Sequence, residues 1–332
     1  MTETKTDFSI RAGAFHGPAL ILAGGSPRFE RTLRSLELPT DAEQTIATDD
    51  YLKGISSIVR MAGDDDFFLR ASLEQEIDAL GVFGRAIVSA DTLWEALQTA
   101  ATALRYYQNN SELVIRTYRG KCRIWYFSPL NAREGKQDVQ YTMGLLAKIV
   151  FLARAQSDPE ITIAYPGGSA AHFKSISAVE SVRDSNQGHF EFNEDLLRAK
   201  MHKSDSVRAG VLTRYLNSRK LVQQPDVKKS DLVAGLVRAS FGVAPWSLSD
   251  TAKVLGTGPR SLQMQLKDEG TAFGKILQSE RHKEACRLLE SGASIDDIAD
   301  TIGFVHRQSF SEAFASWQGC SPSAYIRATI SG

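Results

Sequence analysis

Polar and apolar positions repeat near the C-terminus of the chain. Residues 247–256 align without gaps on residues 294–303, and serine, an aliphatic residue, aspartate, alanine and glycine recur at equal offsets. In each copy the serine is placed to cap a helix, and an aspartate three residues later is favourable near the start of that helix. Gly256 and Gly303 stand where a helix end needs a residue that tolerates positive φ. Each copy is therefore predicted to be a short helix followed by a sharp turn.

A second amphipathic helix is predicted after each turn. Leu262 and Leu266 match Phe310 and Phe314 at the same i, i+4 spacing. Helix, glycine turn and helix form the layout of a helix-turn-helix, whose second helix can enter the DNA major groove. Residues 271–290 contain no proline and are predicted to form one long joining helix. If that helix is rigid, the two second helices could lie on one face about 34 Å apart, which is one DNA turn.

The upstream part of the chain mixes helical and strand patterns. The predicted elements are a helix at 91–107, strands at 112–118 and 122–127, a helix at 137–155, and strands at 161–165 and 189–192. The fold class expected is therefore an α+β N-terminal domain and an all-α C-terminal domain with two helix-turn-helix units joined by a long helix. Eight basic residues lie between 200 and 229, and we expect the domain boundary in that segment, near Pro225.

Composition adds few constraints. The 332 residues suggest about two domains, and 39 basic against 39 acidic residues remove any argument from overall basicity for a nucleic-acid partner. The region from 225 onward is also neutral, with twelve residues of each sign. Three distant cysteines fit free thiols in a reducing compartment. Because no signal peptide or membrane-spanning stretch is evident, we expect a cytoplasmic protein without a membrane partner.

The C-terminal motifs resemble those of the AraC-type (AraC/XylS) bacterial transcription regulators over about the last 100 residues, the size of one domain. The matching motifs are Ala252-x3-Gly256, Pro259-Arg260-Ser261-Leu262-Gln263, Arg281 with Ala285, Ile298-Ala299-x3-Gly303-Phe304, Phe310-Ser311-x2-Phe314 and Trp317-x-Gly319-x-Ser321-Pro322-x2-Tyr325. Residues 81–97 resemble the arabinose-binding-like effector domain of one branch of that family. The resemblance implies an effector-sensing or dimerisation domain at 1–200, a basic connecting segment at 201–224 and a double helix-turn-helix domain at 225–332.

The resemblance also implies which side chains face DNA bases. These DNA-binding positions are Arg260, Ser261, Gln263 and Met264 in the first unit, and His306, Arg307, Gln308, Ser311 and Glu312 in the second. Arginine can bind guanine and glutamine can bind adenine, each contact adding roughly 1–3 kcal/mol of discrimination. Met264 can only touch a thymine methyl or pack. Glu312 could accept from cytosine N4 but would repel phosphate, so we expect the second half-site to be read weakly.

Basic residues crowd the predicted hairpin of the first domain and suggest an effector site. They are Arg116, Arg119, Lys121 and Arg123. Strand alternation could place Arg119 and Arg123 on one face, where they could hold an anionic effector. Arg119-x3-Arg123 also matches half of the PilZ motif that binds cyclic dinucleotides, but the second half of that motif is missing. An ordinary solvated hairpin is the favoured alternative. The aromatic residues Trp94, Trp125, Tyr126 and Phe127 are expected in the core.

Catalysis has no sequence support. His282-x3-Cys286 lacks further metal ligands nearby, and Gly256-Thr257-Gly258 lacks the third glycine of a dinucleotide fingerprint. We expect no catalytic residue, no metal and no cofactor other than a small-molecule effector. The predicted function is that of a DNA-binding transcription regulator, an effector-responsive activator and homodimer on promoter DNA, with RNA polymerase as a partner implied by the resemblance. The alternatives are a small-molecule-binding enzyme with a helical tail and a protein-interaction module.

Overall fold

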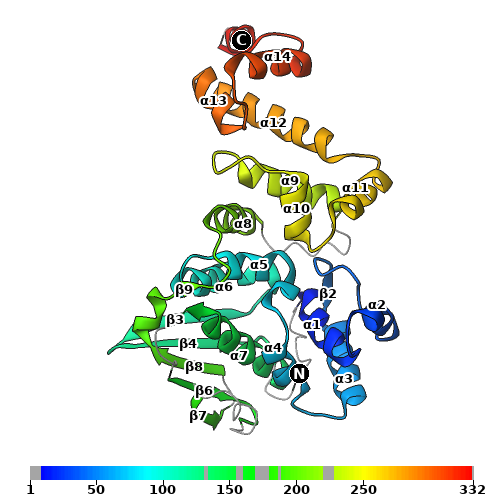
Figure 1. Ribbon diagram of the computed structural model, residues 1–332, viewed down its shortest axis with the longest axis vertical. Helices are drawn as coiled ribbons and strands as arrows, with labels where there is room; N and C mark the ends of the chain where they lie inside the picture. Colours follow the sequence, from blue (N-terminus) through cyan, green and yellow to red (C-terminus); the bar gives the residue numbers. More distant parts are fainter. Residues whose placement is uncertain are drawn as a thin grey trace, which may run out of the picture. The chain divides into compact units, whose positions relative to one another are not determined.

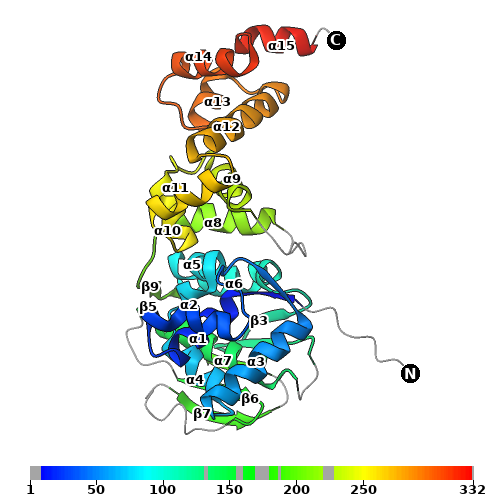
Figure 2. The same ribbon diagram turned by 90° about the vertical axis from the view of Figure 1, so that its right-hand side faces the viewer.

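The computed structural model describes residues 9–130, 134–154, 160–168, 179–185, 188–219 and 228–330. It divides into two compact units, Met1–Asp226 and Val227–Gly332. Figures 1 and 2 show the elements of each unit from two sides. Within the described residues, no helix is both long and apolar enough to cross a bilayer.

The first unit combines helices with a five-stranded sheet, as the α+β prediction requires. Its helices are α1 (Gly13–Leu22), α2 (Ser26–Ser35), α3 (Thr48–Ala62), α4 (Phe67–Glu74), α5 (Gly81–Ser89), α6 (Leu93–Tyr107), α7 (Lys136–Phe151) and α8 (Ser206–Ser218), with 3-10 turns η1 (Ile77–Leu80) and η3 (Glu194–Arg198). Its strands are β1 (Ser9–Arg11), β2 (Thr45–Ala47), β3 (Glu112–Tyr118), β4 (Lys121–Phe127), β5 (Ala153–Arg154), β6 (Ile161–Tyr165), β7 (Val179–Asp184), β8 (Gly188–Asn193) and β9 (Lys200–Met201).

The main sheet has the strand order β3-β4-β8-β6-β7, and only the β6–β7 pair is parallel. Buried and partly exposed residues alternate along β4 and β8, so one face of the sheet is apolar. Helix α7 contacts β6 and β8 and crosses the sheet in Figure 1. The helix predicted at 137–155 ends earlier, at Phe151, because Ala153 and Arg154 form a strand that pairs with β9.

The hairpin of β3 and β4 turns at Arg119 and Gly120, whose φ angles are 51° and 76°. Two consecutive residues with positive φ fit the type I′ turn, which matches the twist of the flanking strands. Arg119 thus belongs to the turn, and the expectation that strand alternation places it with Arg123 is wrong. The register instead sets Arg116 opposite Arg123.

Helix α6 begins at a reciprocal cap. Thr92 Oγ1 accepts from the backbone nitrogen of Glu95 at 3.3 Å, and the Glu95 carboxylate accepts from the backbone nitrogen of Thr92 at 3.3 Å. Tyr126 is buried, as predicted for the aromatic residues of this region. Trp94 and Phe127 were also predicted to lie in the core, but each is 40% exposed. Trp94 lies beside the stripe that contains Leu93, and Phe127 lies on the outer face of the sheet.

A buried carboxylate joins three elements of the first unit. Asp138 of α7 accepts from the hydroxyls of Tyr51 in α3 at 3.1 Å and Tyr126 in β4 at 2.7 Å. Burial raises the pKa of Asp138, although hydrogen bonds from Ser128, Tyr126 and Tyr51 oppose the rise. Because a buried carboxyl is tolerated only when its oxygens are satisfied, this cluster fixes how α3 and α7 meet the sheet.

Helix α8 occupies part of the basic segment predicted to connect the domains. Its residues Val211, Leu212, Tyr215 and Leu216 are buried, and the helix contacts α5 and α6. The segment 201–224 therefore includes a helix packed into the first unit.

The second unit is all helical and contains the two predicted helix-turn-helix units. Its helices are α9 (Lys229–Ser240), α10 (Leu248–Leu255), α11 (Pro259–Asp268), α12 (Phe273–Glu290), α13 (Ile295–Thr301), α14 (Arg307–Gln318) and α15 (Pro322–Ile330). Helices α10 and α11 form the first unit of the repeat, and α13 and α14 form the second. Helix α12 is the long joining helix and has 18 residues.

The repeated serines cap α10 and α13 as predicted. Ser247 accepts from the backbone nitrogen of Asp250 at 3.1 Å, and Ser294 accepts from that of Asp297 at 3.1 Å. Only the first cap is reciprocal, because the Asp250 carboxylate also accepts from the backbone nitrogen of Ser247. Gly256 and Gly303 follow with φ of 69° and 80°, the left-handed conformation that the turns require.

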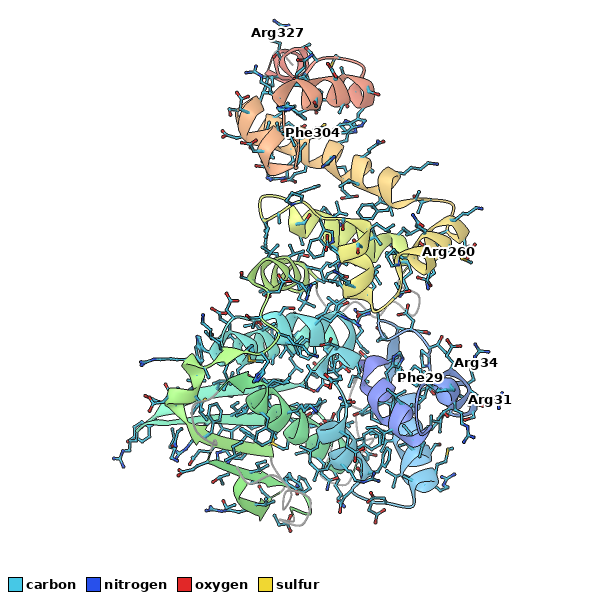
Figure 3. The ribbon with its side chains drawn as sticks, viewed as in Figure 1. Phe29, Arg31, Arg34, Arg260, Phe304 and Arg327 are labelled. Carbon is cyan, nitrogen blue, oxygen red and sulfur yellow. The ribbon has the colours of Figure 1, made fainter. Side chains whose placement is uncertain are left out.

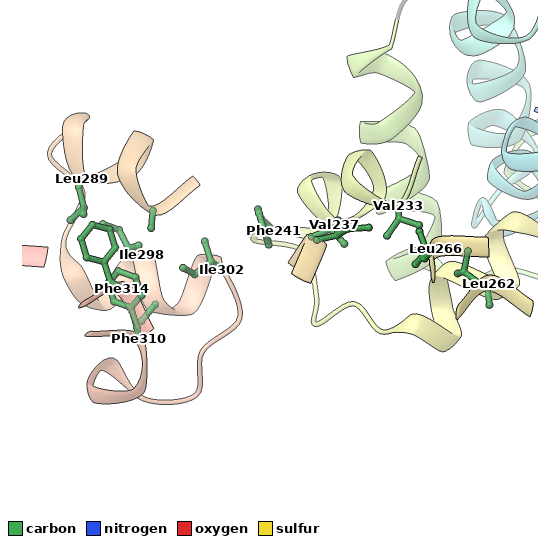
Figure 4. Packing of buried hydrophobic residues seen from close by; sticks show 14 residues of the cluster. Val233, Val237, Phe241, Leu262, Leu266, Leu289, Ile298, Ile302, Phe310 and Phe314 are labelled. Atoms are coloured by element: carbon green, nitrogen blue, oxygen red, sulfur yellow. The ribbon is translucent and has the colours of Figure 1, made fainter. Parts of the chain in front are cut away.

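One hydrophobic cluster runs through the second unit, and Figure 4 shows its labelled members in two groups. Val233 and Val237 of α9 lie with Leu262 and Leu266 of α11. The other group lies around the second helix-turn-helix and contains Leu289, Ile298, Ile302, Phe310 and Phe314. Helix α12 contributes to the same cluster through Ile276, Ala285 and Leu289. Helix α9 contacts α11 and α12, and α12 contacts α13 and α14, so α9 and α12 together join the two helix-turn-helix units.

Removing either cap is expected to destabilise its own helix. We predict that Ser247→Ala and Ser294→Ala each lower the local stability by about 1 kcal/mol, because a backbone N–H loses its partner. Hydrogen-exchange mass spectrometry of peptides from α10 and α13 measures this change. Ser249→Ala, at an exposed position of α10, serves as the control. Equal exchange in the three variants and the wild type would show that the caps contribute nothing.

Candidate DNA-binding interface

Helices α11 and α14 each have one buried face and one solvent-exposed face, at equivalent positions. Leu262 and Leu266 are buried on α11, as are Phe310 and Phe314 on α14. The helical period then directs the residues two positions before and after the first buried residue of each pair away from the core. In α11 these residues are Arg260 and Met264, and in α14 they are Gln308 and Glu312.

The predicted DNA-binding residues of α11 are all exposed. Arg260, Ser261, Gln263 and Met264 lie on its surface, and 60% of Met264 is accessible. Figure 3 shows Arg260 at the outer side of α11. In the part of the chain that the structure describes, the Arg260 side chain has no hydrogen bond or ion pair. Its guanidinium is therefore available for a ligand.

The predicted residues of α14 are mostly exposed, and three of them form contacts within the second helix-turn-helix. His306 is the N-cap residue, and Arg307, Gln308 and Glu312 are exposed whereas Ser311 is half-buried. Arg307 Nη1 lies 3.2 Å from Asp296 Oδ2. Both side chains of this ion pair are more than half exposed, so it contributes little and can open readily.

A second internal contact orders the centre of α14. Gln308 Nε2 donates to Glu312 Oε1 at 3.0 Å, one turn along the helix.

The residue before the N-cap of α14, Val305, is 87% exposed. Sequence reasoning did not identify Val305 as a surface residue, although its position directly before a predicted recognition helix was a usable signal.

Arg281 of α12 holds the turn that precedes α14. Its Nε donates to the carbonyl of Ile302 at 2.8 Å, and its Nη2 donates to that of Gly303 at 2.9 Å. The guanidinium carbon also lies 4.6 Å from the centroid of the Phe304 ring. Burial lowers the pKa of Arg281, but guanidinium groups stay charged in proteins. Arg281 thus positions the second helix-turn-helix against the joining helix.

Glu280, the preceding residue of α12, ties the same helix to α9. It is 3% exposed, with its carboxylate 3.2 Å from Arg238 and 2.7 Å from Lys283. A carboxylate this buried requires such cationic partners. The middle of α12 therefore carries polar ties to both sides of the second unit.

The basic hairpin of the first unit is less open than its sequence suggests. Arg123 forms an ion pair with Glu191 of β8, and the Arg119 guanidinium carbon lies 5.1 Å from the Tyr118 ring centroid. Arg116 is exposed and sits opposite Arg123 in the strand register, whereas Lys121 is half-buried. The structure therefore brings Arg116 and Arg123 together and leaves Arg119 at the tip.

Two further surfaces of the first unit were missed from the sequence. An open hollow of about 460 Å³ is lined by Trp94, Thr117, Glu194, Asp195 and Arg198 among others. Its residues come from α6, β3 and η3, so only the tertiary fold assembles it.

Helix α2 exposes Arg28, Arg31 and Arg34 at three-residue spacing, and Figure 3 shows Arg31 and Arg34 at its outer side. A helical-face count of charges could have found this second surface.

The fold and the exposed recognition helices define a DNA-binding protein with two helix-turn-helix units. The family model for a helix-turn-helix domain matches residues 251–328, and the model for the arabinose-binding domain of AraC transcription regulators matches residues 28–201. The chain belongs to the AraC family of transcription regulators, with an arabinose-binding-like N-terminal domain. These findings favour a DNA-binding regulator over an enzyme with a helical tail or a protein-interaction module.

Relatives named as regulators match most of the chain. The ornithine utilization regulator of Pseudomonas aeruginosa is 26% identical over 266 residues, which is 76% of each chain. The transcriptional regulator VirS of Mycobacterium tuberculosis is 24% identical over 309 residues, covering 88% of this chain and 89% of VirS. The crystal structure of the transcriptional regulator CdpR from Pseudomonas aeruginosa matches 78% of this chain and 86% of its own, with 20% identity and a TM-score of 0.36.

Loss of the Arg281 clamp should impair only the second recognition helix. We predict that Arg281→Met lowers affinity for a complete operator to that for its first half-site, because the turn before α14 loses two charge-assisted hydrogen bonds. Binding measured by fluorescence anisotropy on complete and half operators separates this effect from general unfolding. Arg287→Met on the same helix, which removes only an exposed pair with Glu284, is the control. Wild-type affinity of Arg281→Met for the complete operator would contradict the assignment.

Proposed function

We propose that this protein is an effector-responsive activator that binds promoter DNA in the cytoplasm as a homodimer, with α11 and α14 entering successive major grooves. The observation that carries the proposal is the pair of exposed recognition helices at either end of α12. The 18 residues of α12 span about 27 Å, close to the roughly 34 Å of one DNA turn. A rigid helix of this length supports two insertions from a single chain.

The proposed base contacts follow from side-chain chemistry. Arg260 matches the two acceptors of guanine, and Gln263 matches the acceptor and donor of adenine. Met264 offers only apolar contact to a thymine methyl. Ser261, His306 and Arg307 are placed at or near the helix N-termini, where hydroxyl, imidazole and guanidinium groups can reach phosphate or base edges, and Ser311 lies one turn further along α14.

The first unit is proposed to bind the effector and to dimerise. Effector binding would shift a population between two states of the regulator, and activation would proceed through contact with RNA polymerase. The membership of the N-terminal region in an arabinose-binding family supports a small-molecule ligand. For an anionic effector, the Arg116–Arg123 pair of the hairpin is the site to test first. The proposal includes no catalytic role.

Replacing Arg260 should relax specificity and weaken binding. We predict that Arg260→Ala lowers affinity for a DNA sequence selected by the wild-type protein by about 5- to 150-fold, the equivalent of one bidentate base contact. An electrophoretic mobility shift with the full chain measures the change. Arg327→Ala on α15, also exposed but outside both recognition helices, is the control. Equal losses in the two variants would contradict base reading by Arg260.

Salt dependence distinguishes DNA binding from the protein-interaction alternative. Phosphate contacts make affinity fall steeply as salt rises, whereas a protein partner held by the same helices would show no such slope. The same titration of the wild-type protein from low to moderate salt therefore tests the class of partner.

An anionic effector at the hairpin should depend on paired arginines. We predict that Arg116→Ala and Arg123→Ala each weaken binding of such a ligand at least tenfold, as measured by isothermal titration of the full chain with cyclic di-GMP and with simple dicarboxylates. Trp94→Ala, in the separate hollow of the first unit, is the control. Binding that survives both arginine changes but is lost in Trp94→Ala would place the effector in that hollow.

A further inference from the structure

The two recognition helices carry different chemistry at equivalent positions. Aligning the buried Leu262 with the buried Phe310 pairs the surface residues of the two helices, among which Ser311 is half-buried. The pairs are Arg260 with Gln308, Gln263 with Ser311, Met264 with Glu312 and Lys267 with Ala315. Two cations and a thioether in α11 thus correspond to an amide, a carboxylate and a methyl group in α14.

The surface of α11 is rich in donors and carries one apolar side chain. Guanine presents two acceptors, N7 and O6, in the major groove, and thymine presents a methyl group. Arg260 fits the first pattern, and Met264, 60% exposed, fits the second. A half-site that contains guanine and thymine is therefore complementary to α11.

The surface of α14 presents acceptors at its centre. The hydrogen bond from Gln308 Nε2 to Glu312 Oε1 uses one of the two amide protons of Gln308 and holds the carboxylate, whose Oε2 remains an acceptor. Acceptors recognise the exocyclic amino groups of cytosine and adenine. Adenine, however, sets the N7 acceptor beside its amino group, where it would face the carboxylate. Cytosine, which presents only the N4 donor, is therefore the better match for Glu312.

The two helix-turn-helix units also differ in their local charge. Residues 247–268 contain three basic and two acidic side chains, whereas residues 294–316 contain one basic and four acidic side chains. The one basic side chain of residues 294–316, Arg307, is paired with Asp296. Attraction to phosphate is therefore stronger in the first helix-turn-helix, and the second relies more on base contacts.

We propose that the operator has two unlike half-sites: α11 reads guanine and thymine, and α14 reads a cytosine through Glu312, which Gln308 holds in place. This inference rests on the proposed function, because it requires both helices to enter DNA. It assigns Glu312 as a specificity determinant and not merely as a charge that weakens binding.

Selection of binding sequences from a randomised DNA library tests the assignment. The full-length wild-type protein is expected to enrich guanine and thymine in one half-site and cytosine in the other. Glu312→Gln should lose the cytosine preference and gain adenine, because its amide can both accept and donate. Glu284→Gln on α12, which removes a carboxylate outside the recognition helices, should select the wild-type sequence.

The outcomes distinguish this inference from the proposed function. A cytosine preference that persists in Glu312→Gln, or a second half-site without base preference in the wild type, overturns the role of Glu312 while DNA binding stands. No enriched sequence at all overturns the proposed function itself. Base preference is the readout, since removing a negative charge raises affinity for any DNA.

A second measurement tests Met264 independently. Replacing the selected thymine with deoxyuridine removes only the methyl group, and the wild-type protein should lose about fourfold in affinity, the equivalent of one buried methyl. Met264→Ala should show no such loss. An equal loss in both proteins would overturn the Met264 contact.

Discussion

The burial of both helix-turn-helix units in one hydrophobic cluster with α9 and α12 is the constraint on which the fold of the C-terminal unit depends. A unit of about 25 residues cannot bury enough apolar surface to fold alone. Leu262 and Leu266 at one end and Phe310 and Phe314 at the other therefore belong to a cluster to which α12 also contributes. Because α12 joins the two helix-turn-helix units along the chain, the separation of the recognition helices depends on its length.

Hydrogen bonds and ion pairs fix the orientation in which these buried surfaces meet. Hydrophobic contact alone is non-directional, whereas the two hydrogen bonds from Arg281 to backbone carbonyls require specific geometry, and the Arg238–Glu280 ion pair links α9 to α12. Buried charges of this kind contribute little net stability, and removing one partner leaves the other uncompensated. Their value here is that α12 meets α9 on one side and the turn before α14 on the other in a single arrangement.

Local sequence signals predicted the second unit well because its structure is governed by nearby residues. The serine caps, the glycine turns and the i, i+4 stripes each act within one or two helical turns, and all are present in the structure. The exposure of Arg260 followed from the same helical period, whereas Arg307 is exposed because it is the first residue of α14. Which bases they contact is not decided by the fold and stays a prediction.

The first unit was less predictable because its determinants lie far apart in the chain. Asp138 contacts Tyr51, 87 residues away, and no local pattern marks that pair. The prediction that Arg119 shares a strand face with Arg123 was wrong because a two-residue turn interrupts strand alternation at Arg119. The exposure of Trp94 was missed because its helix places Leu93 and Leu97 in the core and leaves the neighbouring position at the edge.

In this structure a single joining helix separates two recognition helices with different surface side chains. The most direct test is to measure binding to a selected operator before and after five base pairs are inserted between its half-sites. Half a turn moves the second half-site to the opposite side of the duplex, so affinity should fall to that of the first half-site alone. Unchanged affinity for the lengthened operator would show that α12 does not fix the two recognition helices relative to each other.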